Sequence, residues 1–339
     1  MAGGRRLFQA VLGGNTRSFF HGLGRLRGWA LVVSIVLCGC GSSVLRPEFT
    51  VEQRVWTPPH GPTGIQWLTD HYDFRMTAKD EVLVEALPEF METTFAEYGK
   101  LIPPALESSD RLRVYLFDDR PQWADFTRAF VPAQAYMYLH IQSGGYMDHP
   151  TQTSVIFDIG RDRTLALLAH EGLHQYLARF FPEPVPAWLN EGLATQWEAF
   201  ELDGYRPVYT PFRNFFRKND LREALGPTGD LIPLCDLLRM NAGDAVVQAG
   251  QPTRAYYAQV WSLVLFLREG QNKTYLTGFQ TLLADVGTQR LRQSVGAYRA
   301  ATPGAARYRD SEVVFRHYIT EDLDAFVMEY ETFARQLVN

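Results

Sequence analysis

Residues 170–198 read HEGLHQYLARFFPEPVPAWLNEGLATQWE, and the rest of the chain is best interpreted outward from them. The stretch opens with the pattern His-Glu-x-x-His at His170, Glu171 and His174. Residues i and i+4 of a helix share one face, so both imidazoles can reach a single metal ion. Apolar residues at helical spacing surround the motif, and no proline interrupts it before Pro182. Glu171 can take a proton from a water beside such an ion. The pattern therefore predicts a metal site on a helix.

A zinc site of this kind needs a third protein ligand. The metzincin spacing requires glycine and histidine where this chain has Leu177 and Phe180, so that class is excluded. A second helix is predicted to begin at Pro186, a favoured first helical position. If the two helices are antiparallel, a rise of about 1.5 Å per residue returns Glu191 to the level of the histidines. Glu183 lies in the turn and would be too far along the axis.

HEGLHQ followed by WLNEGLATQWE resembles the gluzincin branch of the zincin metallopeptidases, whose aminopeptidase N type carries a similar second motif. By that resemblance His170, His174 and Glu191 bind one Zn²⁺, and Glu171 is the general base. The 16 residues between His174 and Glu191 make a shorter connection than in the aminopeptidase N type. A short turn is characteristic of the bacterial peptidase MA-like domains. The likeness covers roughly residues 65–335 and implies a thermolysin-like fold.

Other candidate site residues are indicated by sequence patterns that are less specific than the two zinc motifs. The resemblance implies a tyrosine over the metal that stabilises the oxyanion. Tyr257, at the start of the predicted helix YYAQVWSLVLFL, is the candidate, with Tyr256 as the second choice; packing at a helix start is the alternative. Glu198, two helical turns after Glu191, is a candidate partner of a ligand imidazole, or else a solvated side chain. Gly144 and Gly145 would let a substrate backbone approach an edge strand, with a plain turn as the alternative.

The order of elements predicts the fold class. Before the motif, strands are expected over HYDFRM and RLRVYLFDD, and two or three more β segments over YMYLHIQ, GGYM and TSVIFDI. Helices are expected over DEVLVEALPEFMETTFAEYGKLI and PQWADFTRAF. After residue 160 the pattern is almost wholly helical, apart from a loop-rich stretch, ELDGYRPVYTPFRNFFRKND. This order describes an α+β protein with an N-terminal mixed sheet, followed by a mainly helical lobe that carries the paired-helix site. No linker is evident, so residues 65–339 are expected to form one peptidase MA-like domain in two lobes.

The N-terminus has the pattern of a secretory signal. Five arginines and no acidic residue precede an apolar run from Trp29 to Cys40. The run ends in LCGC, which resembles a bacterial lipobox. We therefore expect a signal peptide over 1–39, an acylated Cys40 that enters the lipid bilayer, and a tether over 40–64; an uncleaved hydrophobic N-terminus is the alternative. Gly41 is not the aspartate that favours inner-membrane retention in some bacteria, so the outer membrane is preferred.

Charge and composition narrow the function. The chain is 46% hydrophobic and 21% charged, which is globular composition. Removing residues 1–39 changes the formal charge from −5 to −10, which argues against a nucleic-acid partner.

We expect a lipid-anchored zinc metallopeptidase acting on peptides or proteins of the cell envelope. GGYMDH departs from the amine-binding Gly-x-Met-Glu-Asn element of the aminopeptidase N type, which favours an endopeptidase. The alternative is a non-catalytic, zinc-stabilised binding or structural lipoprotein.

Overall fold

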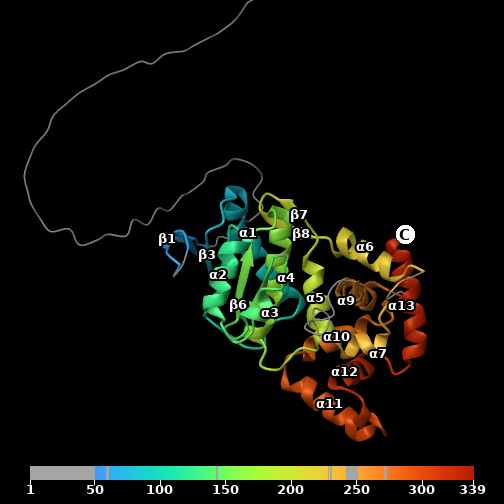
Figure 1. Ribbon diagram of the computed structural model, residues 1–339. Helices are drawn as coiled ribbons and strands as arrows, with labels where there is room; N and C mark the ends of the chain where they lie inside the picture. The colour runs from blue at the N-terminus through green and yellow to red at the C-terminus, as the bar shows by residue number, and fades with distance from the viewer. Residues whose placement is uncertain are drawn as a thin grey trace, which may run out of the picture. The chain divides into compact units, whose positions relative to one another are not determined.

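The N-terminal half of the described chain is built on a six-stranded mixed sheet (Figure 1). The computed structural model describes residues 50–58, 61–142, 144–227, 229, 231–241, 251–270 and 273–339. The parallel pairs are β3–β4 and β4–β6, and the other neighbours are antiparallel. The strand order is β1 (Glu52–Trp56), β2 (Gly64–Leu68), β3 (Tyr72–Met76), β4 (Leu112–Phe117), β6 (Thr153–Phe157) and β5 (Gly145–Asp148). The mixed sheet predicted for this half is thus confirmed.

The alternation of side chains along the strands separates two hydrophobic layers. Leu112, Val114 and Leu116 of β4 join the large core formed with α1 (Glu81–Leu101) and α4 (Arg161–Phe180). On the opposite face, Tyr115 and Phe117 pack with α2 (Arg120–Phe130). The sheet therefore has α1 and α4 on one face and α2 on the other (Figure 1).

The helix that carries the HEGLH motif is held closely against α1 and the sheet. A Cβ added at Gly172 would lie 2.8 Å from the Tyr98 hydroxyl and 2.9 Å from the end of Met91, so the glycine permits this approach. The Tyr98 hydroxyl donates to the Ala169 carbonyl in the same helix. Gln175 Nε2 donates to the carbonyl oxygens of Arg113 in β4, at 2.7 Å, and of Gln152, just before β6, at 2.9 Å. These contacts determine where the motif sits relative to the strands.

The C-terminal lobe is helical and packs around α9 (Gln251–Glu269) (Figure 1). Helix α5 (Ala187–Ala194) follows the motif helix and packs against α9. A Cβ at Gly192 would lie only 2.7 Å from the Val260 carbonyl oxygen, so the glycine permits this close packing. Within the described residues, no helix is both long and apolar enough to cross a membrane. The remaining helices are α6 (Phe215–Ala224), α7 (Leu234–Arg239), α10 (Leu276–Asp285), α11 (Gln289–Ala301), α12 (Asp310–Tyr318) and α13 (Leu323–Val338).

Several sequence expectations need correction. β1 lies within the stretch expected as a tether over 40–64 and pairs with β2, so the sheet begins earlier than residue 65. YMYLHIQ forms no strand; its start is the short helix α3 (Ala135–Tyr138), whose exposed Tyr136 and Met137 mislead a hydrophobicity pattern. The loop-rich stretch after residue 200 contains a hairpin of β7 (Phe200–Asp203) and β8 (Arg206–Tyr209). The expected signal peptide over 1–39 and the acylated Cys40 lie outside the described residues.

Candidate metal centre

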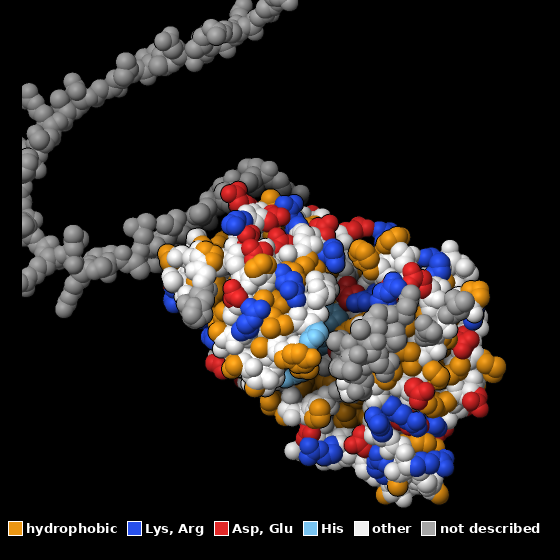
Figure 2. All heavy atoms as spheres, in the orientation of Figure 1, with side chains coloured by type: hydrophobic (Ala, Val, Ile, Leu, Met, Phe, Trp, Pro, Cys, Tyr) orange, Lys and Arg blue, Asp and Glu red, His pale blue; other side chains and the backbone are white. Residues whose placement is uncertain are grey.

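His170, His174 and Glu191 meet where the sheet lobe adjoins the helical lobe. One ligand atom from each lies within 4.8 Å of the other two. α4 supplies the histidines and α5 supplies the carboxylate, as expected for two helices joined by a short turn. All three residues are buried. Figure 2 shows histidine side chains reaching the surface along the boundary between the two lobes.

The distances within this triad match a metal site. Glu191 Oε2 lies 3.4 Å from His170 Nε2 and 3.5 Å from His174 Nε2. Ligands on a tetrahedral zinc with bonds of about 2.0–2.1 Å are separated by about 3.3 Å. These separations exceed ordinary hydrogen bonds, and Glu191 Oε2 is buried with no hydrogen-bond partner among the described residues. A buried carboxylate oxygen without a partner is unfavourable, and a bound cation would remove that penalty.

The second nitrogen of each imidazole has a partner of its own. His170 Nδ1–H donates to Glu198 Oε1 at 2.9 Å, and His174 Nδ1–H donates to Asn190 Oδ1 at 2.9 Å. In the neutral form that binds a metal, with the hydrogen on Nδ1, each Nε2 lone pair would face the triad. Glu198 thus occupies the predicted place, although α5 ends at Ala194 and a 3₁₀ turn, not a continued helix, carries the chain to it.

Charged groups extend the site beyond the triad. Arg217 binds Glu198 through Nε at 2.8 Å and Nη2 at 2.6 Å, and Asn214 Nδ2 donates to Glu198 Oε2 at 2.9 Å. Burial alone would raise the pKa of Glu198, but Arg217 and His170 lower it to about 2. Burial opposes a charge on His170, yet the neighbouring carboxylates of Glu191 and Glu198 raise its pKa to about 10 in the metal-free protein. The carboxylates are therefore ionised and surround a position that favours a cation.

Glu171 and Tyr257 lie next to the triad. Burial raises the pKa of Glu171, while the charges of His174 and His170 act in the opposite direction. The Tyr257 ring centroid is 6.2 Å from that of His170, and the Arg217 guanidinium lies 5.0 Å from the Tyr257 ring. Burial and the carboxylates of Glu191 and Glu171 raise the pKa of Tyr257 well above its usual range. Its hydroxyl therefore stays protonated and can donate a hydrogen bond.

Gly144 and Gly145 have a reason within the fold. A Cβ at Gly144 would lie 2.1 Å from Leu167 Cδ2, and one at Gly145 would lie 2.3 Å from the Val155 carbonyl oxygen. Both also have positive φ angles, 98° and 157°. These glycines allow the chain to enter β5 closely packed on α4 and β6. β5 nevertheless is an edge strand of the sheet, and its Met147 backbone lies close enough to Glu171 to influence that carboxyl.

Two residues that the sequence left without a role also approach the site. The pKa of His149, in the turn after β5, is lowered by burial and by the charge of His174, and the carboxylate of Glu191 opposes this shift only in part. Tyr138 stacks on Tyr146 with centroids 3.8 Å apart, and burial, Asp148 and Glu171 raise its pKa to about 12. Neither has ligand spacing relative to the motif. In the sequence, the only signal for these two residues is that they lie close to β5, a strand that precedes the motif helix.

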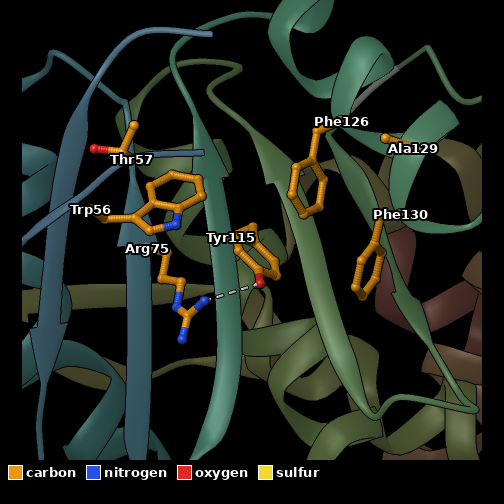
Figure 3. Close-up of a pocket in the computed structure, with 7 residues that line it drawn as sticks. All are labelled: Trp56, Thr57, Arg75, Tyr115, Phe126, Ala129 and Phe130. Atoms are coloured by element: carbon orange, nitrogen blue, oxygen red, sulfur yellow. Dashed lines mark hydrogen bonds between the residues drawn. The ribbon is translucent and has the colours of Figure 1, made fainter. Parts of the chain in front are cut away.

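A hollow lies on the α2 face of the sheet, away from the histidines (Figure 3). Its volume is about 490 Å³. The Arg75 guanidinium lies at one end, within 3.5 Å of the Tyr115 hydroxyl, and is also paired with Asp73. None of the predicted site residues line it; the walls are Trp56, Thr57, Arg75, Tyr115, Phe126, Ala129 and Phe130.

Comparisons of the chain with protein-family models, with curated proteins and with solved structures found no match.

Proposed function

We propose that this chain is a zinc-dependent metallopeptidase with a thermolysin-like arrangement of its two lobes, anchored in a bacterial cell envelope through acylated Cys40. The observation that carries the proposal is the buried triad of His170, His174 and Glu191. Its carboxylate oxygen has no hydrogen-bond partner among the described residues and lies 3.4–3.5 Å from both imidazoles. The α+β architecture and the paired helices agree with the gluzincin resemblance of the two motifs.

Zinc is the metal that this donor set favours. Two imidazole nitrogens and one carboxylate are the ligands of many catalytic zinc sites, which keep a fourth position open. A structural zinc site instead fills all four positions with protein ligands. Among the described residues only three donors gather here, which supports a catalytic site over a structural staple.

The residues around the triad can perform peptide hydrolysis. Zinc held there would polarise the substrate carbonyl and lower the pKa of the attacking water. Glu171 would accept a proton from that water and pass it to the leaving amine. The Tyr257 hydroxyl would donate a hydrogen bond to the developing oxyanion. The outer edge of β5 would hold the substrate backbone by strand addition, which suits an endopeptidase acting on unfolded segments of envelope proteins.

The decisive test compares zinc content and turnover in the same samples. Wild-type protein and Glu171→Gln are each expected to bind one zinc, because the amide keeps the shape of the side chain and Glu171 is not a ligand. Hydrolysis of a library of fluorescence-quenched peptides should fall by roughly 10²–10⁴-fold in Glu171→Gln, since the base is lost. Glu191→Ala should lose the zinc itself.

Two results would overturn the proposal in different ways. Wild-type protein that binds no zinc after reconstitution would remove the metal centre altogether. Zinc-loaded wild-type protein that cleaves no peptide, with Glu171→Gln indistinguishable from it, would favour the non-catalytic lipoprotein.

A further inference from the structure

The segment PFRNFFRKN, residues 211–219, has two opposite faces. On the inner face Asn214 and Arg217 bind Glu198, and Asn214 also caps α6 by accepting from the Arg217 backbone N–H. On the outer face three phenylalanines project into solvent, with exposed fractions of 40% for Phe212, 67% for Phe215 and 65% for Phe216. Large apolar side chains clustered on one surface normally mark an interaction site. We call this outer face, with the cations described next, the phenylalanine surface.

Basic side chains accompany the phenylalanines. Arg213 is 72% exposed and forms an ion pair with Glu201. Lys218 and Arg222 follow Phe215 at three and seven residues, so they lie on the same side of α6. Arg222 donates to the Val338 carbonyl and to Asn219 Oδ1, and within the described part of the chain neither it nor Lys218 forms an ion pair with a carboxylate. No acidic residue occurs from 204 to 219. Figure 2 shows hydrophobic and basic side chains over α6, with acidic side chains among them.

Projecting phenylalanines beside basic side chains suit the surface of an anionic bilayer. The rings can enter the boundary between headgroups and acyl chains, while Lys and Arg remain at the level of the lipid phosphates. These side chains protrude rather than line a groove, so a rigid protein partner would need a matching pocket, whereas a bilayer adapts to them. The apolar run that ends at Cys40 gives an independent reason to expect this domain beside a membrane.

We propose that the phenylalanine surface, residues 212–222, inserts into the headgroup region of an anionic membrane. Because Asn214 and Arg217 of the same segment hold Glu198, which binds His170, insertion would also set the orientation of the metal centre relative to the bilayer. The proposal shares the envelope location with the proposed function but needs neither zinc nor catalysis, so each can fail without the other.

A site-specific fluorescence measurement on the full chain tests the insertion. Native thiols and the acylation site are removed by Cys38→Ser, Cys40→Ser and Cys235→Ala, and a single cysteine is placed by Phe216→Cys. The matched control is Met328→Cys on α13, at a residue that is 68% exposed. Each variant carries a polarity-sensitive dye and is mixed with phosphatidylcholine vesicles, with or without about one third phosphatidylglycerol. The apolar N-terminal run is common to both variants.

The expected result is a blue shift and quenching by brominated lipid at position 216 with anionic vesicles, and neither at position 328. Arg213→Glu with Lys218→Glu should weaken the apparent vesicle affinity of the position-216 signal by about tenfold or more. Circular dichroism and zinc content check that each variant is folded.

Equal signals at positions 216 and 328, or none at either, would overturn the proposal. A signal at position 216 that appears with an unfolded protein substrate but not with vesicles would also overturn it, and would assign the surface to substrate binding.

Discussion

Arg217 determines the charge balance around the candidate metal centre. Its guanidinium neutralises Glu198, so a dication in the triad would be balanced by Glu191 together with Glu171. Buried charges are stable only when paired in this way. The two ligand histidines are thereby held differently, since His170 donates to a carboxylate and His174 donates to a neutral amide.

Asn190 offers a direct test of how His174 is held. Asn190→Ala removes the acceptor of the His174 Nδ1–H, which lies 2.9 Å away. Such partners typically contribute 10–100-fold to metal affinity, so zinc should bind about that much more weakly in competition with a chelator. Asn190→Asp keeps an oxygen acceptor at the same place and should restore the affinity. Equal zinc affinity in wild type and Asn190→Ala would show that Asn190 does not position the imidazole.

Helix α5 is held in place by a close contact with α9, and this contact positions Glu191. Gly192→Ala would place a Cβ 2.7 Å from the Val260 carbonyl oxygen and 2.7 Å from Val264 Cγ2. We expect a loss of about 1–3 kcal/mol in the free energy of unfolding, because the backbone must shift. Zinc affinity should fall with it, since the adjacent Glu191 moves.

Gly296→Ala on α11 is the matched control for this experiment. No atom lies within 4 Å of the Cβ that it would introduce. Alanine favours a helix more than glycine does, so stability should rise by up to about 1 kcal/mol. Urea unfolding measures both variants. Similar stabilities for Gly192→Ala and Gly296→Ala would contradict the proposed role of the α5–α9 contact.

Glu92 connects α1 to the turn between β2 and β3, and it gives the protein a pH-dependent contact. It accepts hydrogen bonds from Thr69 Oγ1 at 2.6 Å, from the His71 backbone N–H at 2.8 Å and from His71 Nδ1 at 2.6 Å. Burial alone would raise the pKa of Glu92, but the hydrogen bonds from His71 and Thr69 lower it below its usual value. Because the pKa of Glu92 is lowered in the folded state, its ionised carboxylate stabilises the fold. This stabilisation is lost as the pH falls and the carboxyl becomes protonated.

Glu92→Gln should therefore lower the free energy of unfolding by about 1–3 kcal/mol at pH 7, because a neutral amide binds these donors more weakly. The difference from wild type should be complete above about pH 5 and shrink as the pH falls through the lowered pKa of Glu92. Urea unfolding at several pH values measures it. A difference that is constant from pH 7 to pH 3 would mean that ionisation of Glu92 is not its source.

At the scale of the whole molecule, the triad connects two lobes. α4 belongs to the core of the sheet, whereas α5 packs on α9 in the helical lobe. A metal bound by both helices would bind the folded chain and not the unfolded one. Zinc at a thousandfold excess over its Kd would then stabilise the fold by about 4 kcal/mol.

Zinc should accordingly raise the Tm by roughly 5–15 °C, and a chelator should reverse the increase. Glu191→Ala should show little response, because one of the three ligands is missing. Calorimetry with and without zinc provides the measurement. An equal increase in wild type and Glu191→Ala would place the stabilising zinc elsewhere on the chain.

Local patterns in the sequence were enough to predict the α+β class, both helices of the site and the three candidate ligands. Helical periodicity and the i, i+4 spacing are properties of residues that are close in sequence. The short turn between α4 and α5 restricts where α5 can lie relative to α4. Glu198 was also predicted, but for a continued helix that the structure replaces with a 3₁₀ turn. The strand over YMYLHIQ was wrong because exposed aromatic residues imitate a buried strand.

Only the tertiary structure brought the rest together. Arg217 and Asn214 reach Glu198 across 19 and 16 residues of chain, so no local spacing could connect them. Tyr257 comes from a helix farther along and was suggested only by the family resemblance. His149 approaches the triad because β5 lies at the sheet edge beside α4. Ligand identity follows from local geometry, whereas the charges and hydrogen bonds that hold the ligands depend on how distant elements pack.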